Sequence, residues 1–449
     1  MKILLISANR LTDPYPVYPL GLDYLAGALS PDHQVRILDR NQMPDTADLT
    51  AAIRDWEPDM VGISLRNADT TDVTQPKGFM AEYSDLMQTV RQATIAPVIL
   101  GGSGFTIFPV EAMQTLDADY GIIGEGERLP QLLAALARGE DPATVDGVVV
   151  RGQAVDPPSP WPGETVRRFD PKGEHLGYYL STGGMLNLQS KRGCPFRCIY
   201  CTYPHIEGRR MRLFAPDAIA RTAVDLQAAG ARYLFITDSA FNAAPEHSLA
   251  VARALRQAGL TIPWGAFFAP TAAEPDYFRI MADCGLSHVE FGTESLSDPV
   301  LAAYGKPFDH QAVFRAHRMA RGAGLHTAHY FLFGGPGETR QTLDDTLTRI
   351  EALDRSVAFM FCGMRIYPHT RLYDLAVAEG QIRADQNLVD PVFYRAPEMD
   401  SRRVTEIIEQ RRQGRMNWVV GAGDPEMTAI TARMYRKGYS GPLWEYLCR

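Results

Sequence analysis

Short apolar runs alternate with amphipathic stretches along residues 1–139 of the chain. Mainly apolar runs occupy residues 3–6, 35–38, 61–65, 97–100 and 120–123, and the stretch 20–29 has the apolar spacing of a helix. Strands without a regularly polar face are buried on both sides, which is typical of a parallel sheet covered by helices. The pattern predicts an N-terminal Rossmann-like unit.

A second series of apolar strands and amphipathic helices fills residues 183–379. Strands are expected at 185–189, 233–237, 264–268, 289–292, 326–333 and 358–367, with helices such as 216–229 and 310–323 between them. Six strand–helix units in a row predict a partial (β/α)6 barrel of the TIM type. The fold class expected for the whole chain is therefore α/β.

Two segments lack this alternation. Residues 140–182 are rich in Pro, Gly and charged side chains, which indicates a linker. Residues 380–449 have a mostly helical pattern with several aromatic side chains and are expected to form a C-terminal helical cap. The predicted division is thus 1–139, 140–182, 183–379 and 380–449.

Length, charge and hydropathy exclude several classes of protein. A chain of 449 residues is too long for one ordinary core. The net charge of −8 argues against nucleic acid as a partner, because a phosphate backbone is usually met by a basic surface. No apolar run approaches the roughly 18 residues that span a bilayer, and the apolar start is too short for a signal peptide. A cytoplasmic location is expected.

Polar residues and glycines follow the strands of the N-terminal unit. In open parallel sheets, ligands bind at the carboxyl ends of the strands. The residues at these ends are Arg66 and Asn67, then Gly101, Gly102, Ser103 and Gly104, then Gly124, Glu125, Gly126 and Glu127. We expect a ligand-binding edge there.

Three of the six cysteines, Cys194, Cys198 and Cys201, lie within eight residues in a C-x3-C-x2-C pattern. Without a secretory signal, such clustering favours a metal site over disulfide bonds. Three thiolates can hold a [4Fe–4S] cluster and leave one iron open to a substrate or cofactor. The alternative is a structural zinc site, which needs a fourth ligand such as His205.

The cysteine loop resembles the signature of the radical S-adenosylmethionine (SAM) superfamily. Segments 235–239, 291–295, 333–339 and 365–370 resemble further family segments in the same order. The resemblance implies a [4Fe–4S] cluster on the three cysteines, reductive cleavage of SAM to a 5′-deoxyadenosyl radical, and an external electron donor such as flavodoxin or ferredoxin. The SAM contacts that it implies are Tyr200, Asp238, Glu294, Gly334, Arg365 and Tyr367. Taken singly, Asp238 also fits a helix N-cap and Gly334 a turn.

An N-terminal sheet in front of such a barrel resembles the domain of B12-dependent radical SAM enzymes that binds cobalamin. The resemblance adds Tyr18, Pro19 and Leu20 in the first loop and helix, and Ser64 and Leu65 at the third strand, to the ligand-binding residues given above. The sequence lacks an Asp-x-His-x-x-Gly motif, so no protein histidine is expected below cobalt. Arg66 is expected to face the lower side of the corrin, unless it pairs with Asp69 or Asp72 or contacts a corrin amide.

Most enzymes that resemble this arrangement are methyltransferases. We therefore expect the protein to methylate an unactivated carbon through methylcobalamin and a 5′-deoxyadenosyl radical. The first alternative is a cobalamin-dependent radical cyclase, rearrangement or oxidation enzyme without methyl transfer, and a remote one is a non-catalytic scaffold stabilised by zinc. A methylthiotransferase that acts on tRNA would carry three further cysteines in its N-terminal domain, where this chain has none. The substrate is expected to be a small molecule, a lipid or a peptide.

Overall fold

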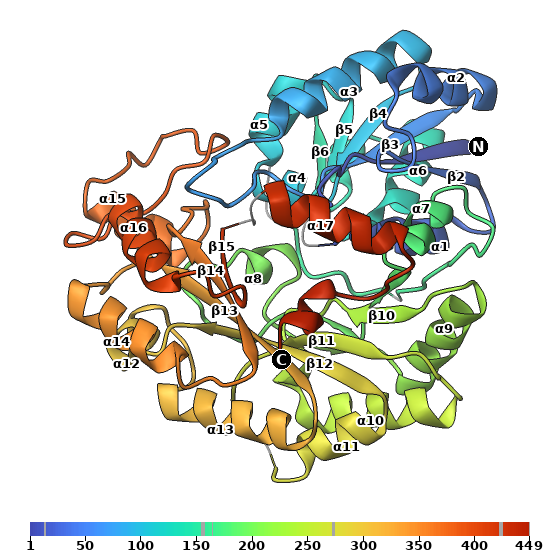
Figure 1. Ribbon diagram of the computed structural model, residues 1–449. Helices are drawn as coiled ribbons and strands as arrows, with labels where there is room; N and C mark the ends of the chain where they lie inside the picture. Colours follow the sequence, from blue (N-terminus) through green and yellow to red (C-terminus); the bar gives the residue numbers. More distant parts are fainter. Residues whose placement is uncertain (13–14, 154–157, 164, 272–273, 422–424, 449) are drawn as a thin grey trace.

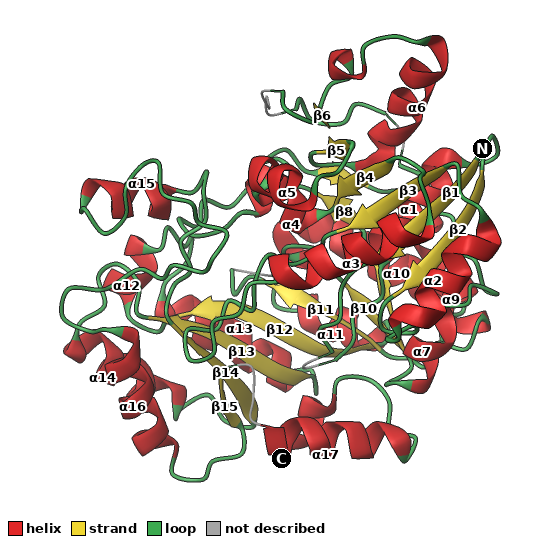
Figure 2. Cartoon of the chain, turned by 90° about the horizontal axis from the view of Figure 1, so that it is seen from above, coloured by secondary structure: helices red, strands yellow, loops and turns green. Residues whose placement is uncertain are grey.

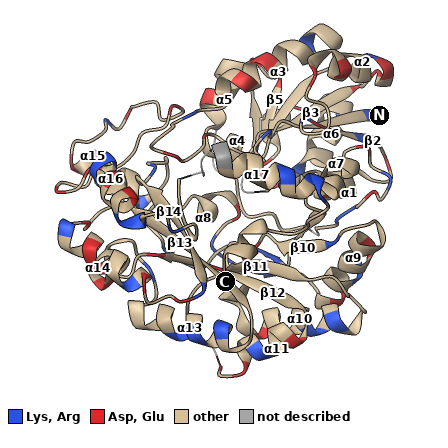
Figure 3. Cartoon of the chain, viewed as in Figure 1, with Lys and Arg blue, Asp and Glu red and all other residues tan. Residues whose placement is uncertain are grey.

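The computed structural model describes all residues except 13–14, 154–157, 164, 272–273, 422–424 and 449. It contains two large sheets, each flanked by helices (Figures 1 and 2). Positions of basic and of acidic residues both occur along the outer helices (Figure 3). None of the described helices combines the length and the apolar character that a membrane crossing requires.

The N-terminal sheet has the strand order β2-β1-β3-β4-β5-β6. Its strands are β1 (Lys2–Ser7), β2 (Gln34–Asp39), β3 (Met60–Ser64), β4 (Val98–Gly101), β5 (Tyr120–Ile122) and β6 (Val148–Val150). Five are parallel, and β6 runs antiparallel to β5. The helices are α1 (Leu20–Leu29), α2 (Thr46–Trp56), α3 (Met80–Ala93), α4 (Ser103–Ile107), α5 (Pro109–Leu116) and α6 (Leu129–Arg138).

Alternate side chains of β1 explain why helices cover both faces of this sheet. Ile3 and Leu5 pack in a cluster with apolar residues of α1 and α6. Leu4 and Ile6 point the other way and pack with residues of α2, α3 and α5. Because all four side chains are fully buried, both faces of the strand are apolar along residues 3–6.

The second sheet has the order β15-β14-β13-β12-β11-β10-β7 and is parallel throughout. Its strands are β7 (Met185–Leu188), β10 (Tyr233–Ile236), β11 (Trp264–Phe268), β12 (Leu286–Glu294), β13 (His326–Phe333), β14 (Ser356–Cys362) and β15 (Trp418–Val420). The helices are α7 (Leu176–Ser181), α8 (Tyr203–Ile206), α9 (Pro216–Ala228), α10 (Pro245–Gln257), α11 (Tyr277–Asp283), α12 (Asp298–Ala303), α13 (His310–Gly322), α14 (Arg340–Ile350), α15 (Arg371–Ala378), α16 (Ser401–Arg412) and α17 (Pro425–Arg436). A two-stranded ribbon, β8 (Lys191–Arg192) with β9 (Arg212–Leu213), stands beside it.

The predicted fold class is confirmed, with differences at three places. Each of the six strands expected in the barrel region is present, but β14 ends at Cys362 rather than at residue 367. β6 extends the first sheet into the expected linker, and β15 extends the second sheet from the expected cap. Both extra strands have three residues, too few for their pattern to stand out in the sequence. The division into four segments stays a prediction.

The C-terminal segment lies against the amino half of the barrel strands. The 3-10 helix η4 (Leu443–Leu447) carries Trp444, whose Nε1 donates to Glu290 Oε1 at 3.2 Å. The next residue, Glu445, lies 2.9 Å from His288 Nδ1 through its Oε1 and accepts a hydrogen bond from the Tyr233 hydroxyl at 2.6 Å. This end of the barrel is therefore occupied by the chain itself.

Buried polar contacts join the two sheets. The Arg365 Nε lies 2.9 Å from Asp69 Oδ2, and the Tyr367 hydroxyl donates to Asp69 Oδ1 at 3.1 Å. Elsewhere, the Tyr18 N–H donates to the Asn187 amide oxygen at 2.9 Å. Asp69 and Tyr18 both lie beyond the N-terminal strands, so these contacts bring the ligand-binding edge of that sheet against the barrel.

Candidate active site

The three clustered cysteines lie on the loop between the ribbon strand β8 and α8. The Cys194 N–H donates to the Gly208 carbonyl at 3.1 Å, and the Ile199 N–H donates to the Tyr304 carbonyl at 3.1 Å. Gly193 has φ +86°, and a Cβ there would lie 2.3 Å from the Arg210 carbonyl oxygen, so only glycine fits. The loop is thus fixed at both ends. All three cysteines line one cavity of about 310 Å³.

Burial sets the chemistry of these thiols. It raises the pKa of Cys201 to about 12 and also raises the pKa of Cys198. Buried thiolates therefore need a strong positive charge beside them, which a metal centre supplies. A [4Fe–4S] cluster takes its thiolates on separate irons, and the three sulfurs on a fixed loop fit this arrangement.

The zinc alternative finds no converging ligands. Within the described residues, no group of three or more His, Cys, Asp or Glu side chains is placed to hold a single metal ion. His205 instead stacks on His369, with ring centroids 4.3 Å apart, and its Nε2 lies 3.2 Å from the Thr106 carbonyl. Its ring is thus held in the contact between α8 and α4.

Opposite the cysteines, β12 ends in a carboxylate that enters the same cavity. The pairing of β12 with β13 shifts between Gly292 and Glu294, and Glu294 has φ +61°, which is uncommon for a residue with a side chain. Its Oε1 pairs with Lys306 Nζ at 2.9 Å. Burial disfavours the charged lysine, but Glu294 and the neighbouring Cys198 outweigh this effect and raise the pKa of Lys306.

A chain of buried polar groups supports this strand end from behind. The Thr293 hydroxyl lies 2.8 Å from His329 Nδ1, and His329 Nε2 lies 3.1 Å from His317 Nδ1. All three side chains are at most 1% exposed. Burial lowers the pKa of both histidines, so both imidazole rings are uncharged at neutral pH. The register shift of β12 is therefore held by hydrogen bonds.

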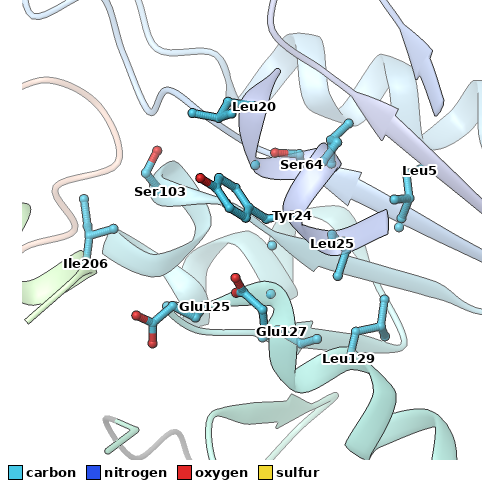
Figure 4. A pocket seen from close by; sticks show the side chains of 18 of the residues that line it. Leu5, Leu20, Tyr24, Leu25, Ser64, Ser103, Glu125, Glu127, Leu129 and Ile206 are labelled. Atoms are coloured by element: carbon cyan, nitrogen blue, oxygen red, sulfur yellow. The ribbon is translucent and has the colours of Figure 1, made fainter. Parts of the chain in front are cut away.

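A second cavity, of about 260 Å³, lies at the carboxyl edge of the N-terminal sheet (Figure 4). Its predicted lining residues are Ser64, Gly101, Gly102, Ser103, Gly124, Glu125, Gly126 and Glu127, with Leu20 at its side. Gly102 has φ +96°, and a Cβ there would lie 2.7 Å from the Leu65 carbonyl oxygen. The glycines therefore make a groove that side chains would fill, which fits an elongated ligand such as the nucleotide tail of cobalamin.

A third cavity, of about 390 Å³, lies between the two sheets. Tyr18, Pro19, Leu20, Ser64, Arg66, Gly102 and Ser103 line it from the N-terminal unit, and Asn187, Tyr203, Phe235, Thr237 and Phe267 line it from the barrel. Its position between two protein layers fits a flat macrocycle such as a corrin. Three of its residues, Tyr203, Thr237 and Phe267, also line the cysteine cavity, so the two spaces share a wall.

Arg66 borders this third cavity without an acidic partner. Asp69 pairs with Arg365, and Asp72 accepts hydrogen bonds from Thr74, so neither expected partner reaches it. Within the described residues, no ion pair of its guanidinium is found. Arg66 is exposed to solvent in this cavity, and desolvation by the surrounding protein lowers its pKa, but a guanidinium stays charged in proteins and cannot ligate cobalt.

Most of the predicted ligand-binding residues line these cavities, and a few do not. Tyr200, Asp238 and Glu294 border the cysteine cavity. Leu65 is instead buried in the core, Asn67 donates to the Asn9 amide oxygen, and Gly104 packs on the Leu65 carbonyl. These three contribute no side-chain atom to the groove, because the chain turns into α4 at this point.

The last three predicted SAM contacts lie outside the lining of the cysteine cavity. The Arg365 guanidinium pairs with Asp69 and donates to the Leu388 and Ile366 carbonyls, and the Tyr367 hydroxyl also binds Asp69. Gly334 donates to Glu338 and lies against Gly363. The side chains of Arg365 and Tyr367 already bind Asp69 of the N-terminal domain. Any contact of these two residues with SAM is therefore predicted to come from their main-chain atoms.

Several residues that line the cavities were not predicted from the sequence. Lys306 and Phe308 enter the cysteine cavity from the loop after α12, and Tyr203 stands between two cavities. Gln189, Arg192 and Glu207 of the barrel half line the groove of the N-terminal sheet. The only available signal was the position of Tyr203 and Glu207 directly after the cysteines. The others meet the site through tertiary packing.

Comparison with known proteins finds a family match in each half of the chain. The family model of the radical SAM superfamily matches residues 188–350, and that of the B12 binding domain matches residues 6–133. The tryptophan 2-C-methyltransferase of Streptomyces laurentii is 27% identical over 82% of this chain and 73% of its own length. An uncharacterized methyltransferase, PH0819, of Pyrococcus horikoshii is 26% identical over 88% of each chain.

Solved structures show the same fold along the whole chain. The radical SAM methyltransferase TsrM from Kitasatospora setae, with cobalamin and a [4Fe–4S] cluster bound, superposes with a TM-score of 0.87 at 22% identity, covering 100% of this chain and 97% of that one. The cobalamin-dependent radical SAM enzyme OxsB gives 0.71 at 14% identity, covering 99% and 72%.

Fold and site together define a radical SAM enzyme with a domain that binds B12. The chain carries both domains of the cobalamin-dependent radical SAM class and is similar to methyltransferases of that class, as the sequence resemblance predicted. Its cofactors are a [4Fe–4S] cluster, SAM and cobalamin.

Proposed function

We propose that the enzyme methylates a carbon of a small, flat substrate bound where the cysteine cavity meets the cavity between the sheets. One observation carries this proposal: Tyr203, Thr237 and Phe267 line both spaces. A methyl acceptor must reach the corrin and the SAM site in one binding pose, and this shared wall is the place that borders both.

The residue assignment follows from the lining of the cavities. Cys194, Cys198 and Cys201 hold the cluster, with Asp238, Glu294 and Lys306 around SAM. The glycine groove holds the nucleotide tail of cobalamin, and Arg66 faces its ring. When bound, cobalamin supplies a methyl carrier, and SAM on the cluster supplies the methyl group and a radical initiator.

Aromatic side chains around the shared wall favour a substrate with an aromatic face. Tyr15 and Phe235 line the cavity between the sheets, Phe268 lines the cysteine cavity, and Phe267 lines both. Such rings exclude water and stack on planar groups. The named activity of the relative from Streptomyces laurentii makes tryptophan the first compound to test, followed by other indoles.

None of the six cysteines forms a disulfide bond in the structure. Cysteines without disulfide bonds, and a cluster that must be reduced, fit the reducing interior of a cell, so we assign the enzyme to the cytoplasm.

The test is anaerobic turnover with SAM that carries a labelled methyl group, cobalamin, a reductant and a panel of indoles and other aromatic compounds. We expect labelled product together with S-adenosylhomocysteine and 5′-deoxyadenosine. 5′-Deoxyadenosine without labelled product, on the panel and on a cell extract, would favour a cyclisation, rearrangement or oxidation. Labelled product without 5′-deoxyadenosine would retain the methyl transfer and remove the radical step.

A further inference from the structure

The segment that carries the cysteines is strongly basic. Residues 191–212 contain six Lys or Arg residues and one carboxylate, Glu207, in a chain whose net charge is −8. A basic segment in an otherwise acidic protein can attract a partner of negative charge.

Three of these six basic side chains form contacts inside the protein. Arg192 pairs with Glu127 at 2.7 Å, and Arg212 pairs with Glu125. The Lys191 Nζ donates to the Ser239 hydroxyl at 3.2 Å. These three groups tie the ribbon to the N-terminal domain and to the barrel, and they are at least half-buried.

Arg197, Arg209 and Arg210 are different, because all three are exposed. Arg197 lies directly before the cluster cysteine Cys198 in the chain. Within the described residues, none of the three guanidinium groups forms an ion pair with a carboxylate. The charge that they add is therefore presented to solvent.

Backbone contacts gather these arginines around the cysteine loop. The Arg209 guanidinium donates to the Phe196 carbonyl at 3.2 Å. The main chain of the next residue, Arg210, packs closely against Gly193 at the start of the cysteine loop. The Leu372 N–H donates to the Ile199 carbonyl at 2.9 Å and brings the exposed Arg371 to the same loop. Phe196 and Cys194 of this loop line the cysteine cavity.

We propose that Arg197, Arg209 and Arg210 form the docking surface for an acidic electron-transfer protein of the flavodoxin or ferredoxin class. In the docked complex one electron leaves the reduced donor, which is oxidised, and enters the oxidised cluster, which is reduced. Short-lived electron-transfer complexes bury little area and depend on charge for their association rate, and a small exposed basic surface over the redox centre meets both conditions.

The experiment mixes pre-reduced flavodoxin with oxidised holoenzyme in a stopped-flow instrument, without substrate, and follows the loss of cluster absorbance. We expect the variant Arg197→Glu/Arg209→Glu/Arg210→Glu to lower the second-order rate constant at least ~10-fold at low salt, within the range of electrostatic steering. Reduction by titanium(III) citrate, a small chemical donor, should be unchanged. The rate of the unmodified enzyme with flavodoxin should fall as salt is added.

A matched control is Arg253→Glu/Arg318→Glu/Arg436→Glu, which changes three exposed arginines elsewhere and shifts the net charge equally. It should stay within about twofold of the unmodified enzyme. Iron and cobalamin contents are measured for every variant. The double variant Arg209→Glu/Arg210→Glu, which changes no residue between Cys194 and Cys201, should keep most of the effect.

Equal slowing of both triple variants, slowing with titanium(III) citrate, or no slowing with flavodoxin would each overturn the proposal. Because the assay measures cluster reduction in the absence of substrate, its result is independent of whether the enzyme transfers a methyl group.

Discussion

The two ends of strand β12 place buried carboxylates in opposite settings. In its amino half, Glu290 accepts from Trp444 and Tyr330, and His288 lies within 2.9 Å of Glu445, so each acid has protein partners and the C-terminal segment covers them. At its carboxyl end, Glu294 has Lys306 as partner and borders an open cavity. The same strand thus carries a closed network that stabilises the fold and an open one that is available to ligands.

The largest expected effect concerns the open end. Cys198→Ala removes a cluster ligand, so iron and acid-labile sulfide of the reconstituted enzyme should fall to background and cluster absorbance should vanish. The control is Cys284→Ala, which changes a buried core cysteine outside the cavity. Retention of a full cluster by Cys198→Ala would contradict the assignment of the cysteine cavity.

At the closed end, Glu445→Gln should destabilise the protein without touching the site. The buried His288 would keep Glu290 at 3.4 Å but lose its nearer acidic partner, which should cost about 1–3 kcal/mol. We expect a lower urea midpoint of unfolding and an unchanged dissociation constant for SAM. Glu409→Gln, which alters an exposed pair on α16, should change neither value measurably. A loss of SAM affinity in Glu445→Gln would break the distinction between the two ends.

The closed end should also respond to pH. Burial lowers the pKa of His288, but Glu290 and Glu445 outweigh it and raise this pKa to about 9. Because the folded pKa exceeds that of the unfolded chain, near 6.5, the stabilisation is complete below about pH 6.5 and is lost as the pH rises through 9. The free energy of unfolding should therefore decline by roughly 3 kcal/mol from pH 6.5 to 9.5. The decline should be smaller in Glu445→Gln, and an equal decline would assign it to other groups.

Substitutions of Thr293 test what holds the carboxyl end of β12, and with it Glu294, in position. Thr293→Val keeps the shape of the side chain but leaves His329 Nδ1 without its partner, which costs about 1–3 kcal/mol locally. We expect SAM binding to weaken about 10-fold, since the strand end that aims Glu294 would relax, while cobalamin binding stays unchanged. Thr293→Ser retains the hydroxyl and should bind SAM normally. Equal loss of both ligands in Thr293→Val would indicate a general structural defect.

The smallest effect is expected at Arg66. Arg66→Lys keeps the charge but changes the shape of the group that faces the cavity between the sheets. If Arg66 lies below the corrin, the absorbance spectrum of bound cobalamin should shift, with turnover altered a few-fold. Arg36→Lys, at the edge of the first sheet, provides the control. An unchanged spectrum and rate would remove Arg66 from the axial position.

Local features of the site were predictable from the sequence. The cysteine spacing and the glycines after β4 and β5 act over a few residues, so the pattern of the chain reports them directly. Lys306 and Gln189 could not be found in this way, because they reach the cavities through the packing of distant segments. For Arg365, a local motif predicted a ligand contact that distant packing makes unavailable to its side chain. Its motif matched the family, yet an aspartate almost three hundred residues earlier in the chain binds its guanidinium.

The short β8–β9 ribbon links the assembly of the two cofactor sites. Arg192 lies immediately before the turn into the cysteine loop, and its ion pair partner, Glu127, lines the groove of the N-terminal sheet. Arg212, on the partner strand, is held by Glu125 of the same groove. A ligand that orders this groove also steadies the base on which the iron–sulfur loop is built. Maturation of the enzyme is therefore expected to proceed best when cobalamin is already in place as iron and sulfide arrive.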